Sequence, residues 1–230
     1  MKFFDSIISD LSLLISDFSQ ISYSFSEKKA WRDVGINQVV LRRDTAYELS
    51  GTSFNLVTSS DIKDEIIVVG DELSDIKENR RFARISLVQI DDEEDEQKAY
   101  NLIRKIEYVK YHCFPDGYMM RTSSSSHKEE VRVAKDAVRG GIDFRSVGNL
   151  FISKYKEITK VKGVKMIFVT VPDADYSLIS RFAEKGNDIT KTLNHVMNSI
   201  NFDCDVCSLK SVCDEVEGMR ELHFGSTQHK

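Results

Sequence analysis

The sequence predicts an α/β (α+β) fold: a mixed sheet with helices packed on it, an N-terminal amphipathic helix and a Cys-rich C-terminal tail. Three observations lead to this class. Apolar residues recur at helical spacing over residues 4–18, strand-like segments follow from residue 37, and strands alternate with helices over residues 83–200. The chain has 230 residues, of which 41% are hydrophobic and 30% charged, which is enough to bury a core.

The first predicted helix has apolar residues on one face and Ser and Asp on the other. We expect it to pack on the domain or on a partner. Asp5, Asp10 and Asp17 interrupt its apolar run, whereas a signal peptide or a membrane span needs an unbroken one. The prediction is therefore a cytoplasmic protein with no membrane partner.

The middle of the chain reads as strands and helices separated by turns. β-Branched and aromatic residues mark the strands, and Pro115-Asp116-Gly117 has the composition of a tight turn after a helix that runs to about Tyr111. Asp143 or Ser146 is expected to cap a helix that continues to Tyr155. The predicted strands are Gln38–Leu41, Ala46–Leu49, Ser53–Val57, Glu65–Val69, Ala83–Ile90, Glu130–Ala134 and Lys165–Val171, and the last two helices are 175–185 and 189–200, split at Gly186-Asn187.

These segments suggest three parts: an N-terminal helix and linker at 1–36, an α/β domain at 37–200 and a cysteine-containing tail at 201–230. The net charge is −5 and the basic residues are interleaved with acids, so no nucleic-acid partner is expected. The sequence contains no Ser-His-Asp order, dinucleotide fingerprint or phosphate-binding loop. We therefore predict no catalytic residue, and the sequence leaves the oligomeric state open.

The tail carries the strongest chemical signal. Cys204 and Cys207 are separated by two residues, Cys213 follows, and His223 lies further along the tail. A CxxC turn directs two thiolates at one metal, and thiolates suit zinc and iron rather than calcium or magnesium. Three reduced thiols without metal remain an alternative. A thioredoxin-like redox motif fits less well, because Cys204 follows a predicted helix and not a strand.

Other polar residues have simpler structural interpretations. His112 and Cys113 suit a helix end and a buried thiol, and His195 is expected to be structural. His127 is expected in an exposed loop. Asp173 and Asp175 follow a buried strand and are expected to cap the next helix.

The tail resembles the start of the active-site cluster motif of acetyl-CoA synthase, the β subunit of the carbon monoxide dehydrogenase/acetyl-CoA synthase complex. Upstream of the tail, weaker resemblances to the same family occur in the family's order, so that the likeness covers residues 40–215. They lie at Arg43–Gly51 with Phe54–Val57, at Glu65–Asp71, at Val131–Val138 and at Val147–Leu150. The individual motifs are short, and their shared order with the cysteines carries the likeness.

The resemblance implies a [4Fe-4S] cluster held by Cys204, Cys207 and Cys213, with His223 near the place of the family's fourth cysteine. The family's nickel-chelating Cys-Gly-Cys segment has no counterpart here, so nickel and independent acetyl-CoA synthesis are not expected. The implied function is an Fe–S-binding accessory protein of anaerobic one-carbon metabolism. Its implied partner is a corrinoid protein or another one-carbon enzyme subunit. The alternatives are an acetyl-CoA synthase fragment completed by another chain, and a zinc-stabilised interaction module.

Overall fold

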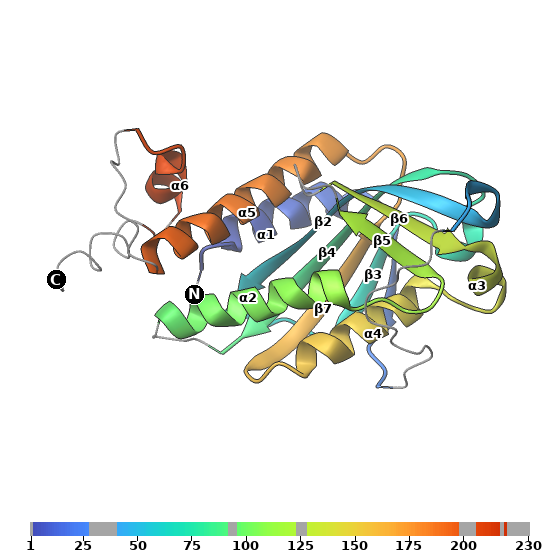
Figure 1. Ribbon diagram of the computed structural model, residues 1–230, viewed down its shortest axis with the longest axis horizontal. Helices are drawn as coiled ribbons and strands as arrows, with labels where there is room; N and C mark the ends of the chain where they lie inside the picture. Colours follow the sequence, from blue (N-terminus) through green and yellow to red (C-terminus); the bar gives the residue numbers. More distant parts are fainter. Residues whose placement is uncertain are drawn as a thin grey trace.

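The computed structural model describes residues 2–27, 41–91, 96–122, 128–197, 206–216 and 219. Within these ranges the strands form one seven-stranded mixed sheet, in the order β1-β3-β7-β4-β2-β6-β5 (Figure 1). Two neighbouring pairs are parallel, β2 with β4 and β3 with β7, and the other pairs are antiparallel. The strands are β1 (Gln20–Ser24), β2 (Ala46–Thr58), β3 (Glu65–Val69), β4 (Arg80–Ile90), β5 (Tyr118–Thr122), β6 (Lys128–Ala134) and β7 (Val161–Val169).

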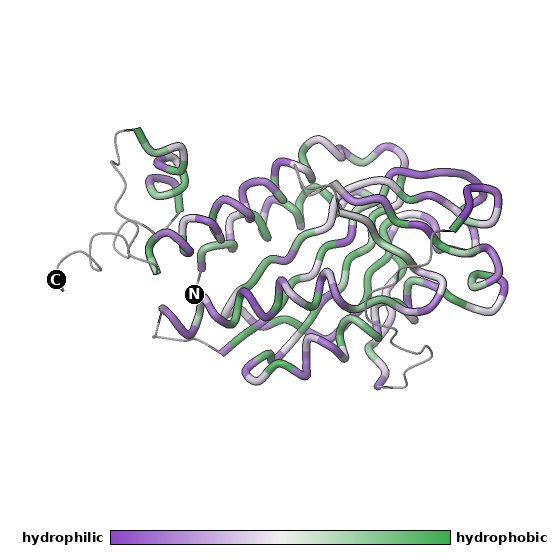
Figure 2. The backbone as a smooth tube through the Cα atoms, viewed as in Figure 1, coloured by the Kyte–Doolittle hydropathy of each residue, from purple (hydrophilic) through white to green (hydrophobic). Residues whose placement is uncertain are grey.

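Helices cover both faces of this sheet and give three layers (Figure 1). One face carries α1 (Asp5–Ser16) and α5 (Tyr176–Met197), and the other carries α2 (Glu96–His112) and α4 (Phe144–Lys156). Smaller helical pieces are η1 (Arg43–Thr45), η2 (Leu73–Asp75), α3 (Lys135–Arg139) and α6 (Lys210–Glu215). Figure 2 shows that the middle of the sheet is largely hydrophobic, whereas hydrophilic and hydrophobic residues alternate along α2 and α5. The predicted α/β class is confirmed.

The predicted N-terminal helix is confirmed, and its apolar face is inside. Ile7, Leu11 and Ile15 are buried in the core, and α1 lies against α5 and β2. Asp5 accepts a hydrogen bond of 2.8 Å from the hydroxyl of Thr58, which ties the start of the helix to the end of β2. Residues near the N-terminus therefore belong to the same core as the sheet.

Two predicted interruptions are wrong. The break at Ser50-Gly51 does not exist, because β2 runs unbroken and pairs with β4 and β6 on its two sides. The split at Gly186 does not exist either, since α5 is one helix. Gly186 faces Leu56 and Phe4 across the contact between α5 and the sheet, and it continues the helix without a break.

Most other predicted elements are confirmed with shifted ends. Asp143 caps α4 by accepting a 2.6 Å hydrogen bond from the backbone N–H of Ser146, and Gly117 has the positive φ expected of its turn. The strand predicted at Lys165–Val171 begins earlier and ends at Val169. Strands β1 and β5 were not predicted. The strand predicted at Gln38–Leu41 falls mainly outside the described residues.

Among the described residues, no helix combines the length and the apolar character that crossing a bilayer requires.

Candidate functional site

The described part of the tail is a short helix seated on α5. Leu209, Val212, Val216 and Met219 are buried, and Lys185 of α5 pairs with Glu215 at 3.3 Å. Figure 1 shows α6 beside the C-terminal part of α5. The apolar residues therefore anchor this segment to the α/β domain.

Two of the predicted ligands, Cys207 and Cys213, lie on this anchored segment. The carbonyl of Cys207 accepts a 3.2 Å hydrogen bond from the backbone N–H of Lys210, which forms a turn just before α6. Cys213 lies within α6, and its backbone N–H donates to the carbonyl of Leu209 at 3.3 Å. Both cysteines are partly exposed, and Cys213 also packs against the hydrophobic core.

The other two predicted ligands, Cys204 and His223, lie outside the described residues. Among the described residues, no group of three or more His, Cys, Asp or Glu side chains is arranged to hold a metal ion. The proposed four-ligand set includes residues outside this search. The metal site therefore stays a prediction.

A second candidate site was missed by sequence reasoning: a buried charge cluster of Arg84, Lys110 and Glu129, with Ser53 and Tyr118 beside them. Strand pairing brings the residues together, because Ser53 is the register partner of Arg84, and Glu129 is the register partner of Gly51, two residues before Ser53. Side chains alternate between faces along a strand, so all of these strand residues point to the α2/α4 face. Lys110 completes the cluster from α2.

The three charged side chains of this cluster are almost fully removed from water, with exposed fractions of 1% for Arg84, 2% for Lys110 and 0% for Glu129. The guanidinium of Arg84 lies 3.9 Å from the Glu129 carboxylate, which is longer than a hydrogen bond. One Arg84 nitrogen donates to the carbonyl of Lys110 at 3.2 Å. The guanidinium also lies over the ring of Phe151, 4.3 Å from its centroid, and this cation–π contact partly offsets the lost hydration.

Several polar atoms of this cluster form no hydrogen bond of good geometry within the described part of the chain, although Ser53 lies close enough to Glu129, and Arg84 to Tyr118, to favour the ionised forms of these groups. They are Ser53 Oγ, Arg84 Nη1, Lys110 Nζ, the Tyr118 hydroxyl and both carboxylate oxygens of Glu129. Buried ions without hydrogen bonds are costly, and proteins usually satisfy them with bound water or a ligand. The concentration of such atoms in one place marks the cluster as chemically distinct from the surrounding core.

Burial also shifts the ionisation of the cluster. Removal from water raises the pKa of Glu129, while the positive charges of Arg84 and Lys110 act in the opposite direction. Burial raises the pKa of Tyr118 to about 12, against the opposing effect of Arg84. The cluster can therefore take up a proton at Glu129 more readily than an exposed carboxylate would.

A chain of hydrogen bonds continues from the cluster toward the surface. Tyr155 donates to the Asn55 side-chain oxygen at 2.9 Å, and its hydroxyl lies 3.1 Å from that of Ser86. The Asn55 amide donates at 2.8 Å to Glu107, whose other oxygen lies 4.0 Å from the Lys110 ammonium. Since Glu107 is partly exposed, the chain links the buried cluster to the solvent side of α2.

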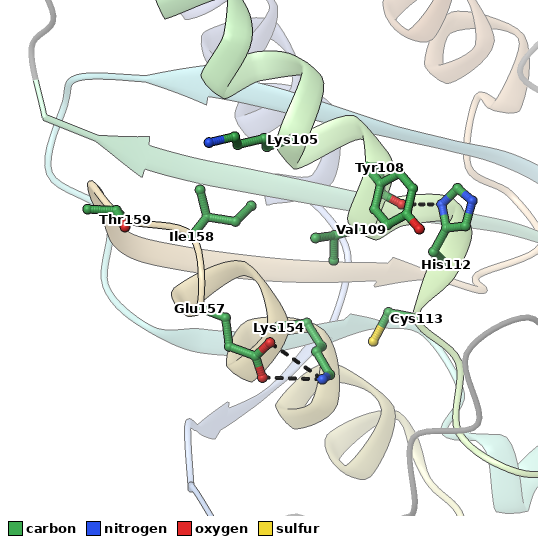
Figure 3. Close-up of a pocket in the computed structure, with 9 residues that line it drawn as sticks. All are labelled: Lys105, Tyr108, Val109, His112, Cys113, Lys154, Glu157, Ile158 and Thr159. Atoms are coloured by element: carbon green, nitrogen blue, oxygen red, sulfur yellow. Dashed lines mark hydrogen bonds and ion pairs between the residues drawn. The ribbon is translucent and has the colours of Figure 1, made fainter. Parts of the chain in front are cut away.

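A pocket of about 470 Å³ opens between the C-terminal parts of α2 and α4 (Figure 3). His112 ends α2, with its ring stacked on that of Tyr108 at 3.7 Å between centroids and its Nδ1 2.7 Å from the Tyr108 carbonyl oxygen. Cys113 follows at the pocket wall and is buried, and Lys154 pairs with Glu157 at 3.2 Å on the opposite side. The structural interpretation of His112 and Cys113 is confirmed.

The remaining sequence candidates take structural positions or are outside the described residues. Asp175 accepts a 2.9 Å hydrogen bond from the backbone N–H of Leu178 at the start of α5, as predicted for a cap. Asp173 is exposed, and His195 is half-buried on α5. His127 falls outside the described residues.

Comparison with known proteins gives no family for this chain. A scan against models of protein families finds no match, and a search of curated proteins finds no match. The resemblance to acetyl-CoA synthase therefore stays a prediction from the sequence.

Proposed function

We propose that this protein is a metal-carrying accessory protein in which the tail cysteines hold an iron–sulfur cluster. The observation that carries the proposal is the position of α6: buried apolar side chains fix the segment to α5, and the partly exposed residues Cys207 and Cys213 lie on this segment. An anchored segment reduces the conformational entropy that a metal must overcome when it gathers its ligands. Cys204 and His223 are the further proposed ligands.

The ligand chemistry supports a soft or borderline metal. Cysteine thiolates bind iron–sulfur clusters and zinc, and a [4Fe-4S] cluster is the choice that agrees with the acetyl-CoA synthase resemblance. With three cysteines in the tail, the cluster needs a further ligand, for which His223 is proposed. A histidine ligand in place of cysteine would raise the reduction potential.

The finer part of the proposal rests on the resemblance alone. An acetyl-CoA-synthase-like protein without the nickel-chelating segment would serve anaerobic one-carbon metabolism as an accessory module. A corrinoid protein is then the preferred partner, and another one-carbon enzyme subunit is the alternative. Nickel chemistry would require a second chain to supply the missing segment.

Metal analysis of protein purified without oxygen tests the proposal. We expect about four iron atoms and matching sulfide per chain, with visible charge-transfer absorption. Cys204→Ser, Cys207→Ser and Cys213→Ser should each lower the iron content. Cys113→Ala should leave it unchanged, because Cys113 lies at the pocket between α2 and α4 and not in the tail.

Each outcome of this experiment decides between the candidates. A colourless, iron-free protein that iron and sulfide cannot reconstitute contradicts the cluster. About one zinc per chain, lost in the same three variants, would instead identify a zinc-stabilised module. Nickel binding with acetyl exchange after mixing with the missing part would favour the synthase fragment.

A further inference from the structure

A groove of about 750 Å³ lies on the α1/α5 side of the molecule, between the first turns of α5 and the adjoining parts of β2 and β4. It is separate from the tail and from the buried charge cluster. Its volume is in the range of small-molecule sites. What distinguishes it is the balance of charge on its walls.

Two guanidinium groups in this groove lack an acidic partner. Arg80 pairs with Asp71, but Arg81 and Arg181 form no ion pair with any residue of the described ranges. Arg81 lies near the ring of Tyr176, with 5.9 Å between its guanidinium carbon and the ring centroid. Both arginines are exposed, so a ligand can reach them.

The acidic residues of the groove do not cancel these charges. Glu48 is already held by Arg132 at 3.2 Å and by Arg43 at 3.6 Å. Glu184 is the remaining carboxylate on the wall, so the two arginines leave an excess of positive charge. The N-terminus of α5 is not the source of this positive charge, because the Asp175 carboxylate already caps it. The positive charge therefore comes from the arginine side chains.

Hydroxyl groups also line the groove. Ser180 and Arg181 lie three and four residues after Ser177, so both are its neighbours on the surface of α5. The hydroxyl of Ser180 lies 3.0 Å from that of buried Thr52, and this hydrogen bond fixes its position over β2. The groove thus combines two guanidinium forks with hydroxyl donors, the groups that proteins use to hold oxyanions.

We propose that this groove binds a small ligand with two oxyanion groups, one at Arg81 and one at Arg181. The guanidinium geometry suits phosphate and carboxylate oxygens, and Ser177 and Ser180 add hydroxyl groups to the wall of the groove. Phosphate esters and dicarboxylates share this chemistry. The site is independent of the proposed metal centre.

Isothermal titration calorimetry at low salt, with inorganic pyrophosphate and with succinate as separate probes, tests the site. We expect saturable binding of at least one probe, weakened about tenfold or more by Arg81→Gln or by Arg181→Gln, as for the loss of one charge-assisted hydrogen bond. The double variant should abolish measurable binding. Arg104→Gln is the matched control, because Arg104 is an exposed arginine on α2, across the sheet.

The two probes separate the ligand classes: a preference for pyrophosphate indicates a phosphate-bearing ligand, and a preference for succinate a dicarboxylate. Absence of binding by both probes overturns the proposal. Equal weakening in the Arg104 variant overturns it too, because it would show general attraction to a charged surface. Thermal melting of each variant confirms that the fold is intact.

Discussion

The two faces of the central sheet differ in what they bury. Under α1 and α5, the middle strands place apolar side chains such as Phe54, Ile85 and Ile167. Under α2 and α4, the neighbouring positions of the same strands place Ser53, Arg84 and other polar groups. Buried polar groups weaken a core unless they are satisfied. The α2/α4 face also buries apolar side chains such as Phe82 and Phe168, which stack on Phe144 of α4. The comparison teaches that both faces supply apolar burial, and that one of them also accepts the energetic cost of a charged cluster.

The largest expected effect is a loss of stability on substitution of Glu129, and the neighbouring Glu130 on β6 serves as the comparison. Glu129→Lys replaces the buried carboxyl with a third cation next to Arg84 and Lys110, in a place that water does not reach. We expect a loss of about 3–5 kcal/mol in the free energy of unfolding, measured by urea denaturation at pH 8. Glu130→Lys is the control, because Glu130 points to the other face and pairs with Arg132 while partly exposed.

The control should lose no more than about 1 kcal/mol. Arg84→Met should cost less than Glu129→Lys, because the Glu129 carboxyl left behind can take up a proton and lose its charge. Similar losses in the two glutamate variants would show that the buried face carries no special electrostatic cost.

The difference between the two faces also shows which features of the fold can be predicted from the sequence. The continuous burial of β2 over residues 52–58 and of β4 over residues 82–88 follows from their largely apolar composition, and both strands were predicted in outline. Arg84 stands in the apolar run of β4, which is a local irregularity. Its meaning depends on Glu129 and Lys110, which arrive from β6 and α2 through pairing and packing. Since single-sequence periodicity carries no information on long-range pairing, the cluster could not be predicted.

The two unpredicted strands have a similar explanation. Strand β1 is a polar, mostly exposed sequence, Gln20–Ser24, that becomes a strand by pairing with β3. Strand β5 directly follows the turn at Gly117 and pairs with β6. In both segments tertiary pairing decides the conformation more than local propensity does. The tail cysteines, by contrast, stand out from spacing alone.

An intermediate effect is expected at the polar chain beside the cluster. Tyr155→Phe removes the hydroxyl that donates to Asn55 and lies next to Ser86, in a side chain that is fully buried. Leaving the Asn55 oxygen without this donor should lower the free energy of unfolding by about 1–3 kcal/mol in the same assay. Tyr108→Phe, at an exposed tyrosine of α2, should change it by less than about 0.5 kcal/mol. No difference between the two variants would mean that the chain adds nothing to stability.

The smallest effect is a pH dependence with an unusual sign. Burial raises the pKa of Glu129 and, despite backbone donors from Phe144 and Leu73, also that of Glu72. A carboxyl with a raised pKa in the folded state binds more protons there than in the unfolded chain. Its contribution to stability therefore falls as pH rises from the ordinary glutamate pKa through the raised one.

Urea denaturation across this pH window measures the sign. Ionisation of these two carboxyls should lower the wild-type free energy of unfolding as pH rises. Glu129→Gln and Glu72→Gln should each remove part of this decrease. Because Glu129 lies in the cluster and Glu72 caps η2 near α4, the two shares should add. A wild-type slope that neither variant changes would show that both carboxyls titrate alike in the folded and unfolded states. The polar face of the sheet would then be hydrated well enough to behave electrostatically like a surface.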